Sequence, residues 1–275
     1  MPGGVARAPG LGPHAAHVHR GTQPAGPPAS GTITLAPGAP TRELRLPVDG
    51  AAAEPYREAE LAQLKWAQSA DVMYLVHPDH PPRRLGRRGN TTWSLTEVDF
   101  ADGPYGEENG DASKTLKPSS VNNGTITAGG HAPFGPSDVG RLIRIKHGST
   151  WGAARIRAVQ SPESVSVDQL EGRDLGGTSA SAAWRLGAWT PAEGFPAVVT
   201  FFEQRTVWAS TRSRPQSFWM SQSGDLENMR PDSFEGGAVE VQDDDALDFT
   251  IAADEVNAIR WLSPGRQLVL GTSGG

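Results

Sequence analysis

The sequence contains one close group of three histidines, a pattern that could bind a metal ion. His14, His17 and His19 lie within six residues of one another, and imidazole nitrogens are common zinc ligands. A zinc site also needs its ligands in a fixed geometry, and the surrounding segment is rich in Gly and Pro. Incidental spacing is therefore the favoured interpretation, and we assign no metal ligand here.

A second pair of histidines, His77 and His80, flanks Pro78-Asp79. A metal-binding or acid–base role is one interpretation, because imidazole titrates near neutral pH. A structural turn is the other interpretation, and Pro followed by Asp favours it. We therefore assign neither histidine a catalytic or metal-binding role.

Acidic residues are densest in Asp243-Asp244-Asp245, with Asp248 nearby. Carboxylates bind Ca²⁺, but a calcium loop alternates its acidic residues and adds a Gly at the turn and a distal Glu. That pattern is absent from this stretch. A solvated turn before a strand is therefore favoured over a cation site.

Two groups of arginines could contact an anion. Arg212 and Arg214 could bind one directly, but pairing with acidic neighbours such as Asp225 is favoured. The second group consists of Arg83, Arg84, Arg87 and Arg88. Nucleic-acid binding by this group would usually add a wider basic field or stacking aromatic residues. A solvated turn or a subunit contact is therefore the favoured interpretation.

The sequence carries no familiar catalytic motif. It has no nucleophile elbow, phosphate-binding loop, dinucleotide fingerprint or zinc-protease motif. It contains no Cys, which excludes disulfides, thiolate metal sites and a cysteine nucleophile. Glycosidase carboxylates are defined by their separation in space, which a sequence does not show. We name no catalytic, cofactor-binding or metal-binding residue and expect a protein that is not an enzyme.

The composition favours short strands over long helices. Of 275 residues, 33 are Gly and 23 are Pro, and eight Trp can anchor a core. The net charge of −6 argues against a general phosphate-binding surface. Residues 1–194 carry 19 basic and 19 acidic residues, whereas 195–275 carry 6 and 12. A solvated acidic face is favoured there over a surface that repels nucleic acid or binds a basic partner. No apolar run is long enough to cross a membrane.

The N-terminal half divides into two parts with different compositions. Residues 1–52 are rich in Gly and Pro and lack aromatic residues, so they are predicted to be disordered or a non-native N-terminus. Residues 53–130 are predicted to hold a short helix, two strands and a long loop. Pro81-Pro82 is expected to prevent continuation of a strand ladder. The expected elements are a candidate strand at 32–35, a helix at 55–70, strands at 71–77 and 92–100, and the loop at 101–130.

The rest of the chain is predicted to be all β, as a small β-barrel at 131–190 and the beginning of a β-propeller-like region at 191–275. In the barrel, Ala154, Ile156 and Ala158 are expected to share one face. The predicted barrel strands are 141–146, 151–159, 164–167 and 182–186. The predicted strands of the last region are 197–202, 206–210, 217–221, 247–251, 256–262 and 267–271. The expected core anchors are Tyr56, Trp66, Trp208, Trp219 and Trp261.

Three stretches, in this order, resemble the tail nozzle proteins of short-tailed bacteriophages and prophages, also called tail tubular protein B. The resemblance covers about 54–275. The first stretch is 54–82, which includes Leu75-Val-His-Pro-Asp-His-Pro-Pro. The second is Phe195-Pro-Ala-Val-Val-Thr-Phe-Phe-Glu-Gln-Arg with Ser213-Arg-Pro-Gln-Ser-Phe-Trp-Met-Ser-Gln-Ser-Gly-Asp. The third is 243–251 with Val256-Asn-Ala-Ile-Arg-Trp-Leu-Ser-Pro-Gly-Arg.

This resemblance implies a structural virion protein made in the host bacterial cytoplasm. Family members form a ring, typically a hexamer, at the distal end of the tail, around the channel through which DNA leaves. They contain a β-propeller-like part and adjoin the tail adaptor and fibres. They also have a folded part in place of residues 1–50 and continue past the position of Gly275, so the resemblance implies a fragment.

The middle unit, Phe134–Leu186, is similar to the small β-barrel labelled as the first-catalytic-cysteine half-domain (FCCH) of ubiquitin-activating enzymes. Without a Cys, this chain cannot form their thioester, so the similarity implies a barrel shape only. Two alternative functions stay open. One is a carbohydrate-binding or carbohydrate-active tail component, motivated by the Trp and Asp content of 208–248. The other is a stand-alone FCCH-like interaction module.

Overall fold

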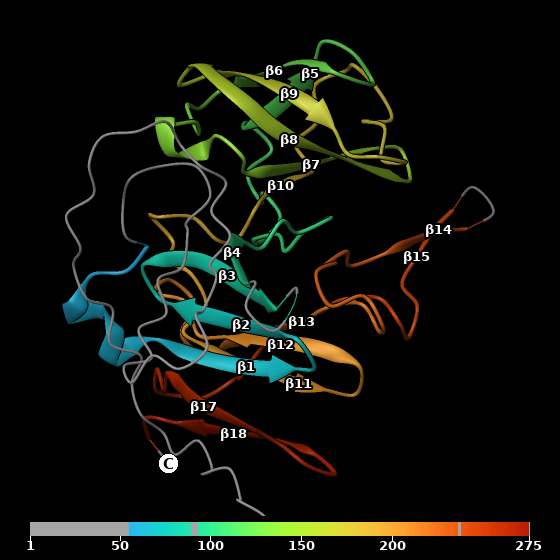
Figure 1. Cartoon of the computed structure of the whole chain (residues 1–275). Coiled ribbons are helices and arrows are strands. Elements are labelled where there is room, and N and C mark those ends of the chain that lie inside the picture. Colours follow the sequence, from blue (N-terminus) through green and yellow to red (C-terminus); the bar gives the residue numbers. More distant parts are fainter. Residues whose placement is uncertain (1–54, 88, 90–92, 236–237, 275) are drawn as a thin grey trace, which may run out of the picture.

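The computed structural model describes residues 55–87, 89, 93–235 and 238–274 (Figure 1). In this part of the chain the protein is nearly all β, with short 3₁₀ turns in place of longer helices. No described helix is long and apolar enough to span a membrane. The candidate strand at 32–35, the histidine group at 14–19 and Arg88 lie outside the described residues.

The first sheet is an antiparallel meander whose four strands pair in chain order. It follows a 3₁₀ helix, η1, at Glu58–Gln63. The predicted helix at 55–70 is therefore wrong beyond Gln63. Residues 65–69 pair instead with the next strand, because Trp66 lies opposite Leu75 and Ala67 opposite Tyr74. The strands are β1 (Lys65–Ser69), β2 (Val72–His77), β3 (His80–Arg87) and β4 (Trp93–Glu97).

The prediction that Pro81-Pro82 prevents a strand is also wrong, because β3 runs through both prolines. The ladder between β2 and β3 is irregular between Leu75 and His77, which is where the prolines lie. The ladder between β3 and β4 begins only at Arg83, opposite Glu97. A proline has no backbone N–H to donate to a ladder. The register shift leaves Pro81 and Pro82 at positions where the ladder needs no such donor.

The second sheet has six antiparallel strands in the order β10-β7-β8-β9-β6-β5 and forms a nearly closed barrel. An isolated bridge between Leu116 and Ser181 joins its two ends. Its core is lined by aliphatic side chains such as Ile126, Ile143 and Val165, all fully buried. The strands are β5 (Thr115–Pro118), β6 (Gly124–Gly129), β7 (Leu142–His147), β8 (Thr150–Ser161), β9 (Ser164–Gln169) and β10 (Trp184–Leu186).

The barrel begins earlier in the chain than predicted, and on β8 one of the residues expected to face the core does not. The expected loop at 101–130 contains β5 and β6, whose Gly, Ser and Asn neighbours conceal the strand pattern. On β8, Ala154 and Ile156 face the core as expected, but Ala158 is exposed. A β-bulge between Ile156 and Ala158 changes the alternation, and Val159 packs on the core instead.

The third sheet again has four antiparallel strands, in the order β11-β12-β13-β16. A hairpin, β14–β15, is inserted between its last two strands and projects to one side in Figure 1. A second hairpin, β17–β18, follows the sheet. The strands are β11 (Val198–Phe202), β12 (Arg205–Ala209), β13 (Ser217–Met220), β14 (Ser233–Glu235), β15 (Ala238–Glu240), β16 (Leu247–Thr250), β17 (Ile259–Pro264) and β18 (Leu268–Thr272).

The first sheet, the third sheet and the β17–β18 hairpin stack like neighbouring blades of a propeller (Figure 1). Their first strands pack together, because β11 contacts both β1 and β17. Both faces of the middle sheet are apolar. Val199 and Trp208 face the first sheet, whereas Val198 and Ala209 face the hairpin with Ile259. The strand β12 is therefore buried along its whole length.

The five predicted aromatic anchors divide into two groups. Tyr56, Trp208 and Trp219 are buried, as expected. Trp66 and Trp261 are each 51% exposed, so their assignment to the core is wrong. Both lie on outer faces of the stack, and the Trp261 ring lies over Gly271 of the paired strand, where a Cβ would come within 1.9 Å of it.

Candidate functional site at the junction of barrel and sheets

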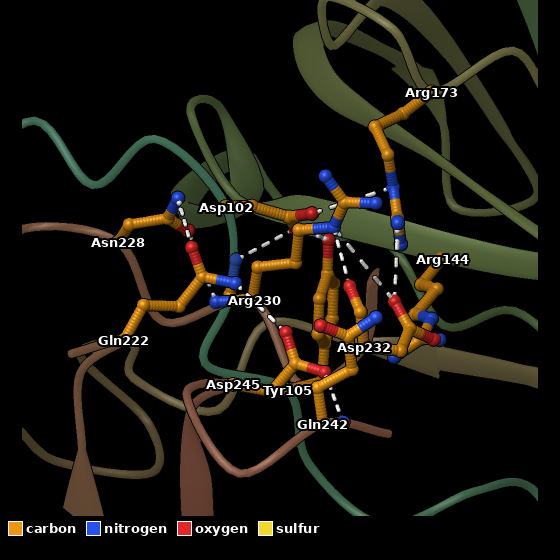
Figure 2. A network of polar contacts seen from close by, with 11 residues as sticks. Asp102, Tyr105, Arg144, Arg173, Gln222, Asn228, Arg230, Asp232, Gln242 and Asp245 are labelled. Atoms are coloured by element: carbon orange, nitrogen blue, oxygen red, sulfur yellow. Dashed lines mark hydrogen bonds and ion pairs between the residues drawn. The ribbon is translucent and has the colours of Figure 1, made fainter. Parts of the chain in front are cut away.

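The barrel is an insertion between the first and third sheets, and the two connecting segments run side by side. The chain leaves the first sheet through residues 98–106 and returns through 187–197. Tyr105 and Gly187 form an antiparallel bridge between these segments. This arrangement places charged residues from distant parts of the chain in one buried group, the ionic junction (Figure 2). Its members are Asp102, Tyr105, Arg144, Arg173 and Asp232.

Each member is positioned by its own local structure. Arg144 lies on β7 between Ile143 and Ile145, so the alternation that buries both isoleucines in the barrel turns the guanidinium outward. Arg173 follows β9, and its backbone N–H donates to the Leu170 carbonyl oxygen at 3.0 Å. Asp102 fixes its own turn by accepting from the Gly103 N–H at 2.8 Å.

The carboxylate of Asp232 bridges two guanidiniums from the barrel. Arg173 Nη1 donates to Asp232 Oδ1 at 3.0 Å, and Arg144 Nη2 donates to Oδ2. Arg173 Nε lies 3.4 Å from Asp102 Oδ2, and the Tyr105 hydroxyl donates to Asp102 Oδ1. Each of these ion-paired side chains is no more than 6% exposed. Because the desolvation of such charges is costly, their mutual contacts are what make their burial tolerable.

The electrostatics of the junction favour fixed charge states. Burial first, and then the neighbouring positive charge of Arg173, lower the pKa of Arg144 to about 10. The guanidinium remains charged at neutral pH and lies over the ring of Trp151 at 4.5 Å and that of Tyr105 at 5.6 Å. Burial first, and then the Asp102 carboxylate, raise the pKa of Tyr105 well above its usual value, so this phenol stays neutral.

Asp245 of the acidic group at 243–245 extends the polar network into the third sheet (Figure 2). Asp245 is fully buried and accepts from Gln222 Nε2 at 2.9 Å and from the Gln242 N–H at 2.8 Å. The expected solvated turn is therefore wrong for Asp245. The buried guanidinium of Arg205 donates to the carbonyl oxygens of Asp243 and Asp245, at 2.5 and 2.6 Å, and so holds the loop.

A cleft of about 340 Å³ lies beside the ionic junction. Its walls come from the 98–106 segment, from β8, from the segment after β9 and from the loop after β13. Three of the residues that line it are arginines, Arg155, Arg173 and Arg230. This cleft with its charged lining makes the junction the candidate functional site.

His77 and His80, which were predicted to flank a turn, lie close together beside Tyr56 and Glu60. The rings of His77 and His80 are 4.9 Å apart, and His80 Nε2 lies 2.9 Å from Glu60 Oε2. His77 is fully buried, and its Nδ1 accepts from the Asp79 N–H at 3.1 Å, as in a structural turn. Burial and the nearby His80 lower the pKa of His77, and burial raises that of Tyr56 to about 12. No group of three potential metal ligands occurs among the described residues.

The two arginines of the Arg-Ser-Arg-Pro stretch are paired, but not with Asp225. Arg212 Nη2 donates to Asp79 Oδ1, which joins the β12–β13 turn to the β2–β3 turn. Arg214 binds the carboxylate of Asp248 through two contacts of 3.2 Å. Asp225 lies near these arginines in the sequence but is not their partner. Asp79 and Asp248 come close to them only through the pairing of strands and the packing of sheets.

The basic group at 83–88 is divided among separate partners. Arg83 pairs with Glu97 at 2.8 Å across the β3–β4 ladder, and Arg84 pairs with Glu227 of the third sheet's loop at 3.1 Å. Arg87 lies 3.8 Å from Asp71. Within the described residues these side chains therefore make no continuous basic field.

The sequence interpretation did not single out any member of the ionic junction. Asp102 and Tyr105 lie in the expected loop, and Asp232 was hidden among ordinary acidic residues. Arg144 carries the one local signal, because it interrupts the apolar run Leu-Ile-Arg-Ile of a predicted strand. An arginine in such a strand needs a partner on the outer face, but the sequence does not say which.

Comparison with models of known protein families and with curated proteins found no match to this chain.

Proposed function

We propose that this chain is a structural protein of a bacteriophage or prophage tail, a part of the nozzle that surrounds the departing DNA. The observation that carries the proposal is the architecture: a small barrel inserted into a stack of blade-like antiparallel sheets. The resemblance in sequence to tail nozzle proteins implies the propeller-like part, and the similarity of Phe134–Leu186 to the FCCH half-domain implies the barrel. Partners of the proposed assembly are further copies of the chain, the tail adaptor and the fibres.

The use of the charged residues supports a structural role over a catalytic one. Two of the arginines that could have formed a site instead join the first sheet to the third. The two pairs are Arg212 with Asp79 and Arg84 with Glu227. Such contacts hold the relative orientation of the units, which a tail conduit under mechanical load requires.

The outer faces of the stack are suited to contacts with neighbouring subunits. Trp66 on β1, Trp261 on β17 and Val269 on β18 are each 51% exposed. Large apolar side chains at exposed positions are common in surfaces that bind other proteins. In the proposed ring, these faces meet adjacent blades or adjacent copies.

The test is the oligomeric state and shape of the product of the complete gene from which this chain comes. Mass photometry and negative-stain electron microscopy are expected to show a ring of identical subunits. Stable monomers at micromolar concentration would contradict the proposal. Labelling of purified virions with an antibody against the barrel would then place the ring at the tail tip or away from it.

The carbohydrate alternative loses its tryptophan argument in this structure. It rests on the Trp and Asp content of 208–248, but Trp208 and Trp219 are 0% and 1% exposed. A Trp219→Ala variant would therefore disrupt the core and would not report on glycan binding.

A further inference from the structure

The third sheet presents an apolar face toward the β17–β18 hairpin, and the hairpin covers only half of it. One residue from each strand forms a cross-strand row on this face, which consists of Val198, Ala209, Phe218 and Phe249. Val198 and Ala209 on the inner strands are 4% and 0% exposed, because they pack with Ile259 of β17. Phe249 on the outermost strand is 51% exposed. Among the described residues, the outer half of this face therefore lacks a covering layer.

The opposite face of the same sheet is covered across its width. Trp208 and Trp219 lie on that face, and each is no more than 1% exposed. The layer over them includes the four-stranded first sheet, whereas the hairpin has two described strands. Because β17 packs on β11, β18 lies on the outer side of the hairpin. Two further strands beside β18, each about 4.8 Å from the last, would extend the hairpin over the exposed half.

The outer edge of β18, which faces away from β17, has the features of a place where another strand pairs. No described strand pairs with this edge. The Trp261 ring of β17 lies across Gly271 of β18, where a Cβ would come within 1.9 Å of it. Trp261 and Val269 are each 51% exposed. A strand added at this edge would therefore bury apolar surface and also continue the ladder.

The sequence before the described residues contains two short runs with strand character. The first is Thr32-Ile-Thr-Leu, and the second is Leu44-Arg-Leu-Pro-Val. Apolar residues alternate in both runs, which indicates strands with one buried face. A proline is tolerated in an edge strand. Between the runs lies Pro37-Gly38, a dipeptide typical of turns, so the segment has the pattern of a hairpin.

We propose that residues 31–48 form two strands that pair with the outer edge of β18 and cover the outer half of the third sheet. By themselves these residues bury too little apolar surface to offset the cost of ordering them. The exposed surfaces at Phe249 and Trp261 supply the missing contacts. The inference concerns only the packing of the stack, so it does not depend on the proposed tail function.

The connection to the described chain is long enough for this pairing. Val48 precedes Pro55, the first described residue, by seven positions, and seven extended residues span up to about 25 Å. Lys65 at the start of β1 donates from Nζ to the Arg260 carbonyl oxygen of β17. The start of the first sheet therefore adjoins the hairpin that the segment is proposed to extend.

The experiment compares hydrogen exchange in the full chain with exchange after deletion of residues 1–30 or of residues 1–52. We expect the amides of β18 to be protected in the full chain and after the shorter deletion. The longer deletion should speed their exchange about 10-fold or more, because it leaves the outer edge of β18 open to local unfolding. Mass spectrometry of peptides that contain 268–272 measures the rates, and the buried strand β12 serves as the internal reference for an intact fold.

Point variants separate pairing by this segment from a general effect of truncation. Leu46→Asp places a charge on the face proposed to lie against Phe249, and it should speed exchange in β18 as the longer deletion does. The matched control is Arg45→Asp, which introduces the same side chain on the opposite face of the run and should leave the rates unchanged.

Three results would overturn the inference. The first is equal exchange of β18 in the full chain and after deletion of 1–52. The second is an equal effect of Leu46→Asp and Arg45→Asp. The third is protection of β18 that survives the longer deletion and rises with protein concentration, which would assign this edge to a second copy of the chain.

Discussion

Two interfaces organise the described part of the chain, and they use opposite chemistries. The first is the aromatic interface between the first and third sheets, formed by Tyr74, Phe100, Trp189, Trp208 and Trp219. Its rings pack mostly edge to face, for example Tyr74 on Trp208 at 5.5 Å and Trp189 on Trp219 at 5.6 Å. The second is the ionic junction between the barrel and the sheets, in which charged groups replace the rings.

The difference concerns how much each interface depends on precise geometry. The burial of apolar surface is non-directional, so most of the stability of the aromatic interface tolerates small displacements. A buried ion pair gains only when both charges and their hydrogen bonds are in place, and it becomes a liability when one partner is removed. The aromatic interface therefore supplies stability, and the ionic junction fixes the barrel in one orientation relative to the stack.

The comparison predicts that the largest loss of stability comes from the aromatic interface. Trp208 is fully buried and contacts Tyr74, Phe100 and Trp189. We expect Trp208→Ala to lower the free energy of unfolding by about 3–5 kcal/mol, because it removes apolar contacts and leaves a cavity. Urea denaturation followed by circular dichroism measures this loss.

The control for this change is Trp66→Ala, the same substitution at a position that is 51% exposed. A loss of about 0.5 kcal/mol or less is expected for such a surface position. If both variants lost similar stability, the assignment of Trp208 to the core and of Trp66 to an outer face would be wrong.

The next largest effect is expected at the ionic junction. Asp232→Asn keeps the shape of the side chain but leaves Arg144 and Arg173 buried without the carboxylate they share. We expect a loss of about 3 kcal/mol, accompanied by faster hydrogen exchange in residues 100–106 and 222–232. Asp168→Asn breaks an exposed pair with Arg157 and should cost about 0.5 kcal/mol or less. A fully stable Asp232→Asn variant would show that the junction does not orient the barrel.

The smallest expected effect is a pH dependence at the edge of the first sheet. The pKa of His77 lies below its ordinary value of 6.5 in the folded protein, chiefly because of burial. The unfolded chain therefore binds a proton that the folded chain does not, so stability is full above about pH 6.5 and falls as the pH decreases. His77→Asn keeps an acceptor near the Asp79 N–H and should flatten the stability profile between about pH 7 and 5. An unchanged slope would assign the acid sensitivity to other groups.

The distribution of charge shows why the sequence misleads at the junction. The net −6 lies entirely in residues 195–275, which suggested an acidic face. In the folded protein, Asp232 and Glu227 of this segment pair with Arg144 and Arg84 from the earlier part of the chain. Asp245 is buried. Charges that are segregated along the chain are therefore partly neutralised in space.

Local patterns in the sequence determined much of the secondary structure. Alternation and β-branched residues predicted β7, β9, β11, β12 and β13 near their observed bounds, because each strand buries one or both faces. They missed β1, β3, β5, β6, β14 and β15. Residues 65–69 follow a helix-like start with no apolar alternation. The strands β5 and β6 are short, and the residues around them are rich in Gly, Ser and Asn.

The sequence by itself determined that this protein is built of short strands and lacks cysteine chemistry. The tertiary structure alone decided which tryptophans are core, which arginine meets which aspartate, and that Arg144, Arg173 and Asp232 share one buried site. The physical reason is the separation in sequence of the residues that interact. Strand formation depends on residues a few positions apart, whereas the bond between Arg144 and Asp232 joins groups 88 positions apart.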